Sequence, residues 1–210
     1  MMGVSVYYKG TLTDMDALLR LVDEIRDICQ IMKWEYHTLN DDWTEPVEVS
    51  LERKDGGLKI GGNLGLKGIG FKPHPASECV DFYFDSDGNL DAPAYRALRL
   101  QKGETNSEET FVCIKTQFAP ANIHVAVIKL LKYLKEHYIH DLEVIDEGEY
   151  WETGSLEKLE YHRNVINEGL DVLEKVLTDT PRKPGLSSEE YEGYISDVIR
   201  KVFDKNRDSK

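Results

Sequence analysis

The amino-acid sequence predicts an α+β fold, with a mixed, largely antiparallel sheet, two strand–helix–strand units and two C-terminal helices. Three observations predict it. Apolar residues recur with period two, then with helical spacing, then with period two again over residues 4–39, and the same order recurs over residues 110–145. Between these units, residues 47–84 alternate as strands do, and beyond residue 153 the pattern is purely helical. Helices segregated from an antiparallel sheet are typical of α+β domains.

The first unit begins with residues 4–8, whose β-branched and aromatic side chains favour a strand. Gly10 ends this strand, and Thr13 is placed to cap a helix, with Asp16 as the reciprocal acid. Apolar residues at three- and four-residue spacings then predict a helix with one buried face. They are Leu18, Leu21, Val22, Ile25, Ile28, Cys29 and Met32. Residues 34–39 alternate and predict the next strand.

The middle of the chain is predicted to be rich in strands. Residues 47–51 and 58–66 alternate on either side of Asp55-Gly56-Gly57, which is a hairpin turn signal. The apolar phase then slips by one residue at Lys67-Gly68, as a β-bulge or a turn produces.

A further strand is predicted over residues 80–84, followed by a turn at residues 85–89 and a short helix around residues 92–100. The turn has the acidic composition of a calcium loop. When these residues are aligned with a twelve-residue calcium loop, however, Tyr83 takes the first ligand position and Ala94 the twelfth. Neither side chain can bind calcium there. We therefore interpret it as a hairpin turn.

The second unit consists of a strand over residues 110–117, a helix with Pro120 in its first turn and an apolar stripe from Ile123 to Tyr138, and a strand over residues 142–145. Superimposed on the first unit at an offset of 106 residues, it matches the apolar positions of the helix. This pseudo-repeat indicates either an ancient duplication or the agreement that any two amphipathic helices show. A single sheet with two helices on one face needs no repeat.

The pattern predicts three parts: a sheet domain over residues 1–152, a long helix packed on it over residues 153–180, and a linker with a terminal amphipathic helix over residues 181–210. Ser187-Ser188-Glu189-Glu190 has the form of a capping box. Apolar stripes on the two terminal helices must be covered by the sheet, by each other or by a second subunit. A homodimer through these helices is therefore one expected assembly.

Composition excludes several classes of function. The chain has 210 residues with 26 basic and 39 acidic side chains, a net charge of −13 that disfavours nucleic acid as a partner. No apolar run is long enough to cross a membrane, and the first residues lack the pattern of a signal peptide. Three widely spaced cysteines, Cys29, Cys79 and Cys113, are typical of reduced thiols, so we expect a cytoplasmic protein with no membrane partner.

Residues 141–152, which we call the acidic segment, are the densest polar feature. Six of these twelve residues are acidic and none is Lys or Arg, so solvent, a cation or a basic partner must offset their repulsion. Asp146 and Glu147 follow the predicted strand, at a sheet end where sites often lie. The alternative is a solvated loop that leads into a helix start. The predicted ligand- or partner-binding residues are Lys115, Gln117, His124, Asp146, Glu147, Glu149, Tyr150, Trp151 and Glu152.

His124 is predicted to lie at the edge of the buried face of its helix, near the helix N-terminus. There it could form a cradle for a carboxylate or phosphate with Lys115, Thr116 and Asn122, or be a boundary histidine with satisfied hydrogen bonds.

His74 lies between Pro73 and Pro75, which hold the segment extended. With His124, Asp146 and Glu147 it provides metal-ligand residue types, with Glu78 nearby in sequence. No HExxH or His-x-His spacing supports this set.

No sequence motif marks a catalytic triad, and the glycines between Gly56 and Gly70 form no nucleotide-binding pattern. We expect a non-catalytic protein that binds a basic protein partner or a small ligand, as an inhibitor or immunity-type protein does, without a cofactor. The alternative is a metal-assisted hydrolase, in which a divalent metal held by Asp146 and Glu147 with His124 or His74 activates water.

Overall fold

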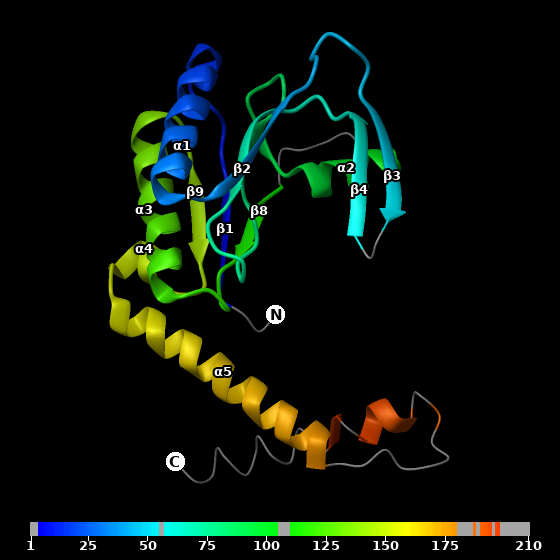
Figure 1. Cartoon of the computed structure of the whole chain (residues 1–210), viewed down its shortest axis with the longest axis vertical. Coiled ribbons are helices and arrows are strands. Elements are labelled where there is room, and N and C mark those ends of the chain that lie inside the picture. Colours follow the sequence, from blue (N-terminus) through cyan, green and yellow to red (C-terminus); the bar gives the residue numbers. More distant parts are fainter. Residues whose placement is uncertain are drawn as a thin grey trace. The chain divides into compact units, whose positions relative to one another are not determined.

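The computed structural model describes residues 4–54, 57–104, 110–179, 187, 190–194 and 196–197. The chain divides into two compact units, residues 3–160 and residues 161–210. In the first unit, helices combine with antiparallel sheets, which confirms the α+β class (Figure 1). Among the described helices, none combines the length and apolar character that a bilayer crossing requires.

The first sheet has three strands in the order β8-β1-β9. Their bounds are Ser5–Lys9 for β1, Val112–Lys115 for β8 and Glu143–Asp146 for β9. β1 is central and antiparallel to both neighbours, with Tyr7 opposite Cys113 on one side and Ile145 on the other. Helix α3 (Ala121–His137) connects β8 to β9, and these two strands lie on either side of β1.

The second sheet has the order β2-β5-β6-β7, again with antiparallel pairs. The bounds are Glu35–Asn40 for β2, Lys67–Lys72 for β5, Val80–Phe84 for β6 and Leu90–Asp91 for β7. Helix α1 (Leu18–Met32) joins β1 to β2, so the two strands of the first unit belong to different sheets. Both predicted strand–helix–strand units are present, but they differ in topology.

β3 (Glu48–Lys54) and β4 (Gly57–Asn63) form a two-stranded ribbon, so the predicted hairpin is confirmed, although its turn residues 55 and 56 lie outside the described residues. Gly68 lies inside β5 and not in a turn. A Cβ atom there would lie 2.0 Å from the Phe82 carbonyl oxygen, and its φ is +148°. Glycine is therefore required by the close approach of β6.

Helices α1 and α3 cover one face of the sheets, which we call the inner face (Figure 1). Inward-pointing side chains of both sheets, such as Val6, Phe82 and Ile114, are fully buried against them. Tyr8 links the sheets, because its hydroxyl donates to the Asp81 carbonyl (2.8 Å) and accepts from the Asp81 N–H (3.0 Å).

The opposite, outer face is covered in part by the β3–β4 ribbon and helix α2 (Pro93–Gln101). A small second core forms here from Leu64, Leu66, Tyr83 and Ala97. Helix α2 is also anchored electrostatically, because Arg96 (3.4 Å) and Arg99 both contact the fully buried carboxylate of Asp91.

Asp14, and not the predicted Thr13, caps the short 3-10 helix over Met15–Ala17 that precedes α1. The Asp14 carboxylate accepts from the Asp16 N–H (2.9 Å), whereas the Thr13 hydroxyl accepts from the His140 N–H (3.2 Å). Because the Thr13 hydroxyl is engaged with the chain beyond α3, the cap is supplied by the next residue, Asp14.

After β9 come α4 (Tyr150–Thr153) and α5 (Leu156–Asp179), and the boundary between the two units falls inside α5. That α5 packs on the sheet stays a prediction. The capping box is confirmed: the Ser187 N–H donates to the Glu190 carboxylate (2.9 Å) and the Glu190 N–H to the Ser187 hydroxyl (3.3 Å). The predicted helix after it falls largely outside the described residues.

Candidate functional site

The fold compensates most of the acidic segment from within. Four of its carboxylates accept a backbone N–H or pair with a lysine. Their partners are the Thr11 N–H for Asp141 (2.9 Å), Lys9 for Glu143 (3.4 Å), the Ser5 N–H for Glu147 (2.9 Å) and Lys158 for Glu149 (2.8 Å). An external cation at this segment is therefore not needed to explain its charge.

His124 and Asp146 form a buried pair beneath the end of the first sheet. His124 Nε2 lies 3.1 Å from Asp146 Oδ1, and both side chains are fully enclosed. The other ring nitrogen, Nδ1, lies 2.7 Å from the Thr116 hydroxyl oxygen. The sequence placed His124 at the edge of the buried face, but it lies inside the core, with both nitrogens engaged.

Asp146 also holds the turn between β9 and α4. Its carboxylate accepts the Gly148 N–H (2.7 Å) and the Trp151 N–H (2.8 Å). Burial alone would raise the pKa of Asp146, but the hydrogen bonds from His124 and from these two amides outweigh it and hold the pKa below its ordinary value. The carboxylate is therefore an internal anchor, and its contacts do not direct it toward solvent.

His74 does not join this pair. Its Nδ1 accepts the Ala76 N–H (3.1 Å) within its own turn, and Glu78 accepts the Lys115 N–H (2.8 Å). Among the described residues, no three His, Cys, Asp or Glu side chains are grouped so that they could hold a metal ion. His74 instead lines a cavity of about 250 Å³ beside Trp34 and Lys72.

The remaining predicted site residues are dispersed. The Lys115 ammonium lies 5.7 Å from the centre of the Phe118 ring, and Lys132 lies 5.4 Å from that of Trp151. Tyr150 and Trp151 pack against the main core, whereas Glu152 is exposed. Gln117 is 2% exposed, and neither polar atom of its side chain has a hydrogen-bond partner within the described part of the chain.

The outer face of the first sheet is more open. Tyr7 lies in the central strand between Cys113 and Ile145, yet Tyr7 and Cys113 are only half-buried and Ile145 is 54% exposed. The inward neighbours Val6 and Tyr8 are fully buried. Of this cross-strand row, Ile145 is exposed, whereas Tyr7 and Cys113 are partly covered. The predicted strand alternation, which sent Ile145 away from Val144, is confirmed.

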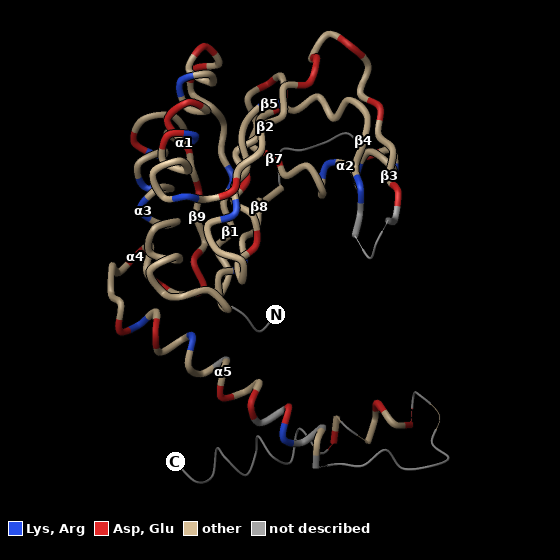
Figure 2. Tube along the Cα trace, viewed as in Figure 1, with Lys and Arg blue, Asp and Glu red and all other residues tan. Residues whose placement is uncertain are grey.

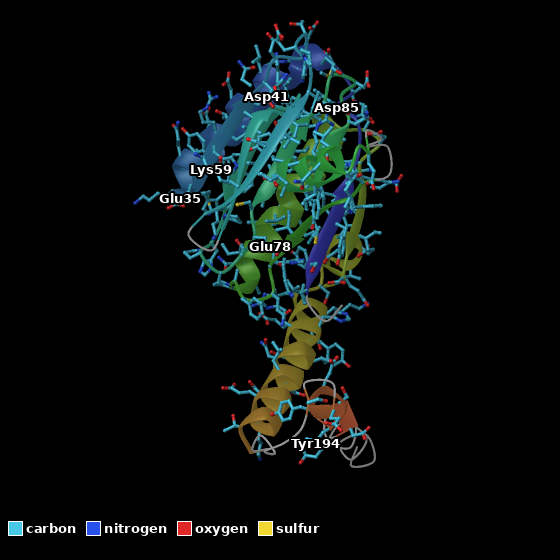
Figure 3. The ribbon with its side chains drawn as sticks, turned by 90° about the vertical axis from the view of Figure 1, so that its right-hand side faces the viewer. Glu35, Asp41, Lys59, Glu78, Asp85 and Tyr194 are labelled. Atoms are coloured by element: carbon cyan, nitrogen blue, oxygen red, sulfur yellow. The ribbon has the colours of Figure 1, made fainter. Side chains whose placement is uncertain are left out.

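Asp81 is a partly buried carboxylate of the second sheet. It lies on the outer face beside Gly70 of β5 and His37 of β2, in one cross-strand row. Figure 3 shows Glu35 and Glu78 on the same side of the molecule. Sequence reasoning missed Asp81, because no local motif marks it. The available signal was its position between the inward-facing Val80 and Phe82, which sends its side chain outward.

Comparison with known proteins finds no family that matches this chain, and no match among curated proteins or solved structures.

Proposed function

We propose that this chain is a non-catalytic binding protein whose outer face docks a basic protein, in the manner of an inhibitor or immunity-type protein. The observation that carries the proposal is the exposed Ile145 at one end of the cross-strand row that it forms with the partly buried Tyr7 and Cys113. In an antiparallel sheet, a face with apolar side chains is normally packed against another layer. An apolar row with charged residues on either side is typical of a protein interface.

Charge supports the choice of a basic partner. The net charge of −13 attracts a cationic surface and speeds its encounter. Figure 2 displays acidic positions along the connection from β2 to β3 and into β3, where residues 41–52 contain five acids and no Lys or Arg. This charge steers the partner toward the molecule, and the apolar row supplies the area that holds it.

The contacts of His124 and Asp146 favour this function over hydrolysis. A general base must reach a substrate or a water molecule, and a metal-bound histidine needs a free ring nitrogen. Both nitrogens of His124 are engaged with Thr116 and Asp146 inside the core. We therefore assign this pair to the folding of the sheet end.

Two further parts of the proposal have separate support. Cys29, Cys79 and Cys113 are free thiols, in keeping with a reducing, cytoplasmic location. Tyr161 (66% exposed) and Val165 (50% exposed) on α5 would favour a homodimer through the terminal helices, and sizing of the chain with and without residues after Pro181 tests it.

The docking proposal is tested by capture from native cell extract at about 0.05 M and about 0.5 M salt. The variant Ile145→Lys is compared with Ile31→Lys, which makes the same charge change at an exposed position on α1. We expect a basic protein to be retained by the wild type and by Ile31→Lys, and to be lost from Ile145→Lys. Purified partner must then reproduce the difference. Equal retention by all three forms, or no specific retention at either salt, contradicts the proposal.

A further inference from the structure

A cavity of about 250 Å³ lies at the end of the second sheet where α1 leads into β2, and we call it the Trp34 cavity. Two segments that are far apart in the chain line it. Residues 33–35 connect α1 to β2, and residues 72–75 lead out of β5. Figure 3 labels Glu35, which marks this end of the sheet. The register of β2 and β5 sets Glu35 opposite Lys72 and so brings the two segments together.

The walls of the Trp34 cavity are held in place by the fold itself. The Trp34 ring is stacked on Phe71, with 5.2 Å between the ring centres and 3° between the ring planes. Prolines on both sides of His74 fix their own backbone angle φ, and Pro73 is buried. The His74 carbonyl also accepts the N–H (3.0 Å) and the hydroxyl (2.9 Å) of Ser77. A ligand therefore meets a preformed wall of indole and proline rings, which lowers the entropy cost of binding.

The polar groups of the lining are mostly hydrogen-bond donors. His74 Nδ1 accepts the Ala76 N–H (3.1 Å), so Nε2 is the nitrogen that carries the ring proton. The side chains of Lys33 and Lys72 make no hydrogen bond or ion pair within the part of the chain that the structure describes. A ligand that satisfies these donors must offer acceptor oxygens and negative charge.

The charge of the lining is opposite in sign to that of the chain. Two lysines and one glutamate give the lining a net charge of +1, whereas the whole chain carries −13. Glu35 can balance one of the lysines, which leaves one ammonium group for an anion. A carboxylate carries one negative charge and matches this remainder, whereas a phosphate monoester carries about −1.5 to −2 at pH 7.

Lys33 occupies a backbone position that favours glycine. It ends α1 in the left-handed region, with φ +56° and ψ +38°. Glycine is the usual residue at such a helix end, because it has no Cβ atom to clash there. Lysine at this position accepts backbone strain and places an ammonium group in the lining of the cavity.

We propose that the Trp34 cavity binds a small aromatic carboxylate. The carboxylate accepts hydrogen bonds from Lys33, Lys72 and His74 Nε2, and the ring packs against the indole of Trp34 and the neighbouring prolines. Drug-sized ligands occupy sites of about 300–1,000 Å³, so the volume of this cavity selects a ligand with a single ring. The site uses other residues than the exposed Ile145, and the inference does not rest on the proposed function.

The test titrates the full-length protein with benzoate and follows its N–H signals by NMR. We expect the indole signal of Trp34 and the amide signal of Ala76 to move and saturate, while the indole signals of Trp43 and Trp151 stay in place. Benzamide has the same ring without the charge, and acetate has the charge without the ring. Each should bind at least about tenfold more weakly than benzoate, because each lacks one half of the recognition.

Substitutions then assign the binding to the cavity. Lys72→Gln should weaken benzoate binding about fivefold or more. The control Lys129→Gln makes the same change of charge at an exposed position on α3 and should weaken it by less than about twofold. Lys33→Gly should also weaken binding without lowering the midpoint of thermal unfolding, because glycine accepts the left-handed conformation.

Three results would overturn the proposal. The first is the absence of a saturating shift at Trp34 below about 10 mM benzoate. The second is equal binding of benzoate and either benzamide or acetate. The third is an equal effect of Lys72→Gln and Lys129→Gln, which would show that benzoate responds only to the overall charge of the protein.

Discussion

Asp81 and Asp146 are carboxylates in the same unit whose environments shift their pKa values in opposite directions. Burial without a partner raises the pKa of Asp81 to about 6, whereas hydrogen bonds from His124 and two backbone amides hold that of Asp146 below its ordinary value in spite of burial. One carboxylate therefore destabilises the fold when it ionises, and the other stabilises it.

The first prediction concerns Asp146. Asp146→Ala leaves the His124 ring and the Gly148 and Trp151 amides without their acceptor, so the free energy of unfolding at pH 7 should fall by about 3 kcal/mol. Urea denaturation measures it. Glu152→Ala, on the exposed side of α4, should change the free energy by less than about 0.5 kcal/mol. A similar midpoint for both variants would show that the pair does not anchor the turn.

The pH dependence of this loss has a definite sign. Because the folded-state pKa of Asp146 lies below its unfolded value, the stabilisation is complete above about pH 4 and is lost as pH falls through the folded-state pKa. The difference between wild type and Asp146→Ala should therefore shrink in acid. A difference that grows below pH 4 would contradict this account.

The second prediction concerns Asp81, and its sign is reversed. The pKa is raised on folding from 3.8 to about 6, so ionisation costs stability progressively between about pH 4 and pH 6 and fully above that. Asp81→Asn should therefore raise the free energy of unfolding at pH 8 by about 1–2 kcal/mol, after allowance for partial solvent screening, and leave it unchanged below pH 4. Denaturation at pH 8 and pH 3.5 tests both halves of the statement. A destabilised variant at pH 8 would mean that the carboxylate has a favourable internal partner.

The third prediction compares two glycines with positive φ. Gly68→Ala places a Cβ atom 2.0 Å from the Phe82 carbonyl oxygen, so β5 and β6 must separate, and we expect a loss of about 3 kcal/mol or more. Gly103 also has a positive φ (+77°), but nothing lies within 4 Å of its Cβ position. Gly103→Ala should cost only about 1–2 kcal/mol from the backbone conformation. Thermal unfolding of both variants separates close contact from backbone strain, and equal losses would rule out the contact.

The fourth prediction concerns the thiols. Burial raises the pKa of Cys29 to about 11, and its side chain is fully buried, whereas Cys79 and Cys113 are half-buried. With a disulfide reagent at pH 8, Cys79 and Cys113 should react in the folded protein, and Cys29 only after unfolding. Mass spectrometry of the labelled peptides identifies the reacting residues. Rapid labelling of Cys29 would contradict its placement in the core.

Local patterns were enough to predict most secondary structure. The period-two runs became β1, β6 and β8, and the apolar stripe at helical spacing became α1, because these periodicities report which side chains one element can bury. The capping box of Ser187 and Glu190 was also predictable, because its hydrogen bonds join residues that are only three apart in sequence.

The candidate sites were less predictable, because their partners are distant in sequence. His124 was recognised as a residue of interest, but its burial depends on Thr116 and Asp146. The sequence shows no basic residue within the acidic segment, but it does not show the partners that the fold brings to it. Lys9 lies far from Glu143 in the chain and reaches it only through the pairing of β1 with β9.

The chain by itself thus determined the α+β class, the order of its elements, its negative charge and which residues of each strand share a face. Tertiary structure decided which strand lies beside which, and so placed Gly70 between His37 and Asp81 and left Ile145 exposed beside Tyr7. The physical reason is that periodicity along one element reports burial, whereas the neighbours of a carboxylate are set by strand register between segments far apart in sequence.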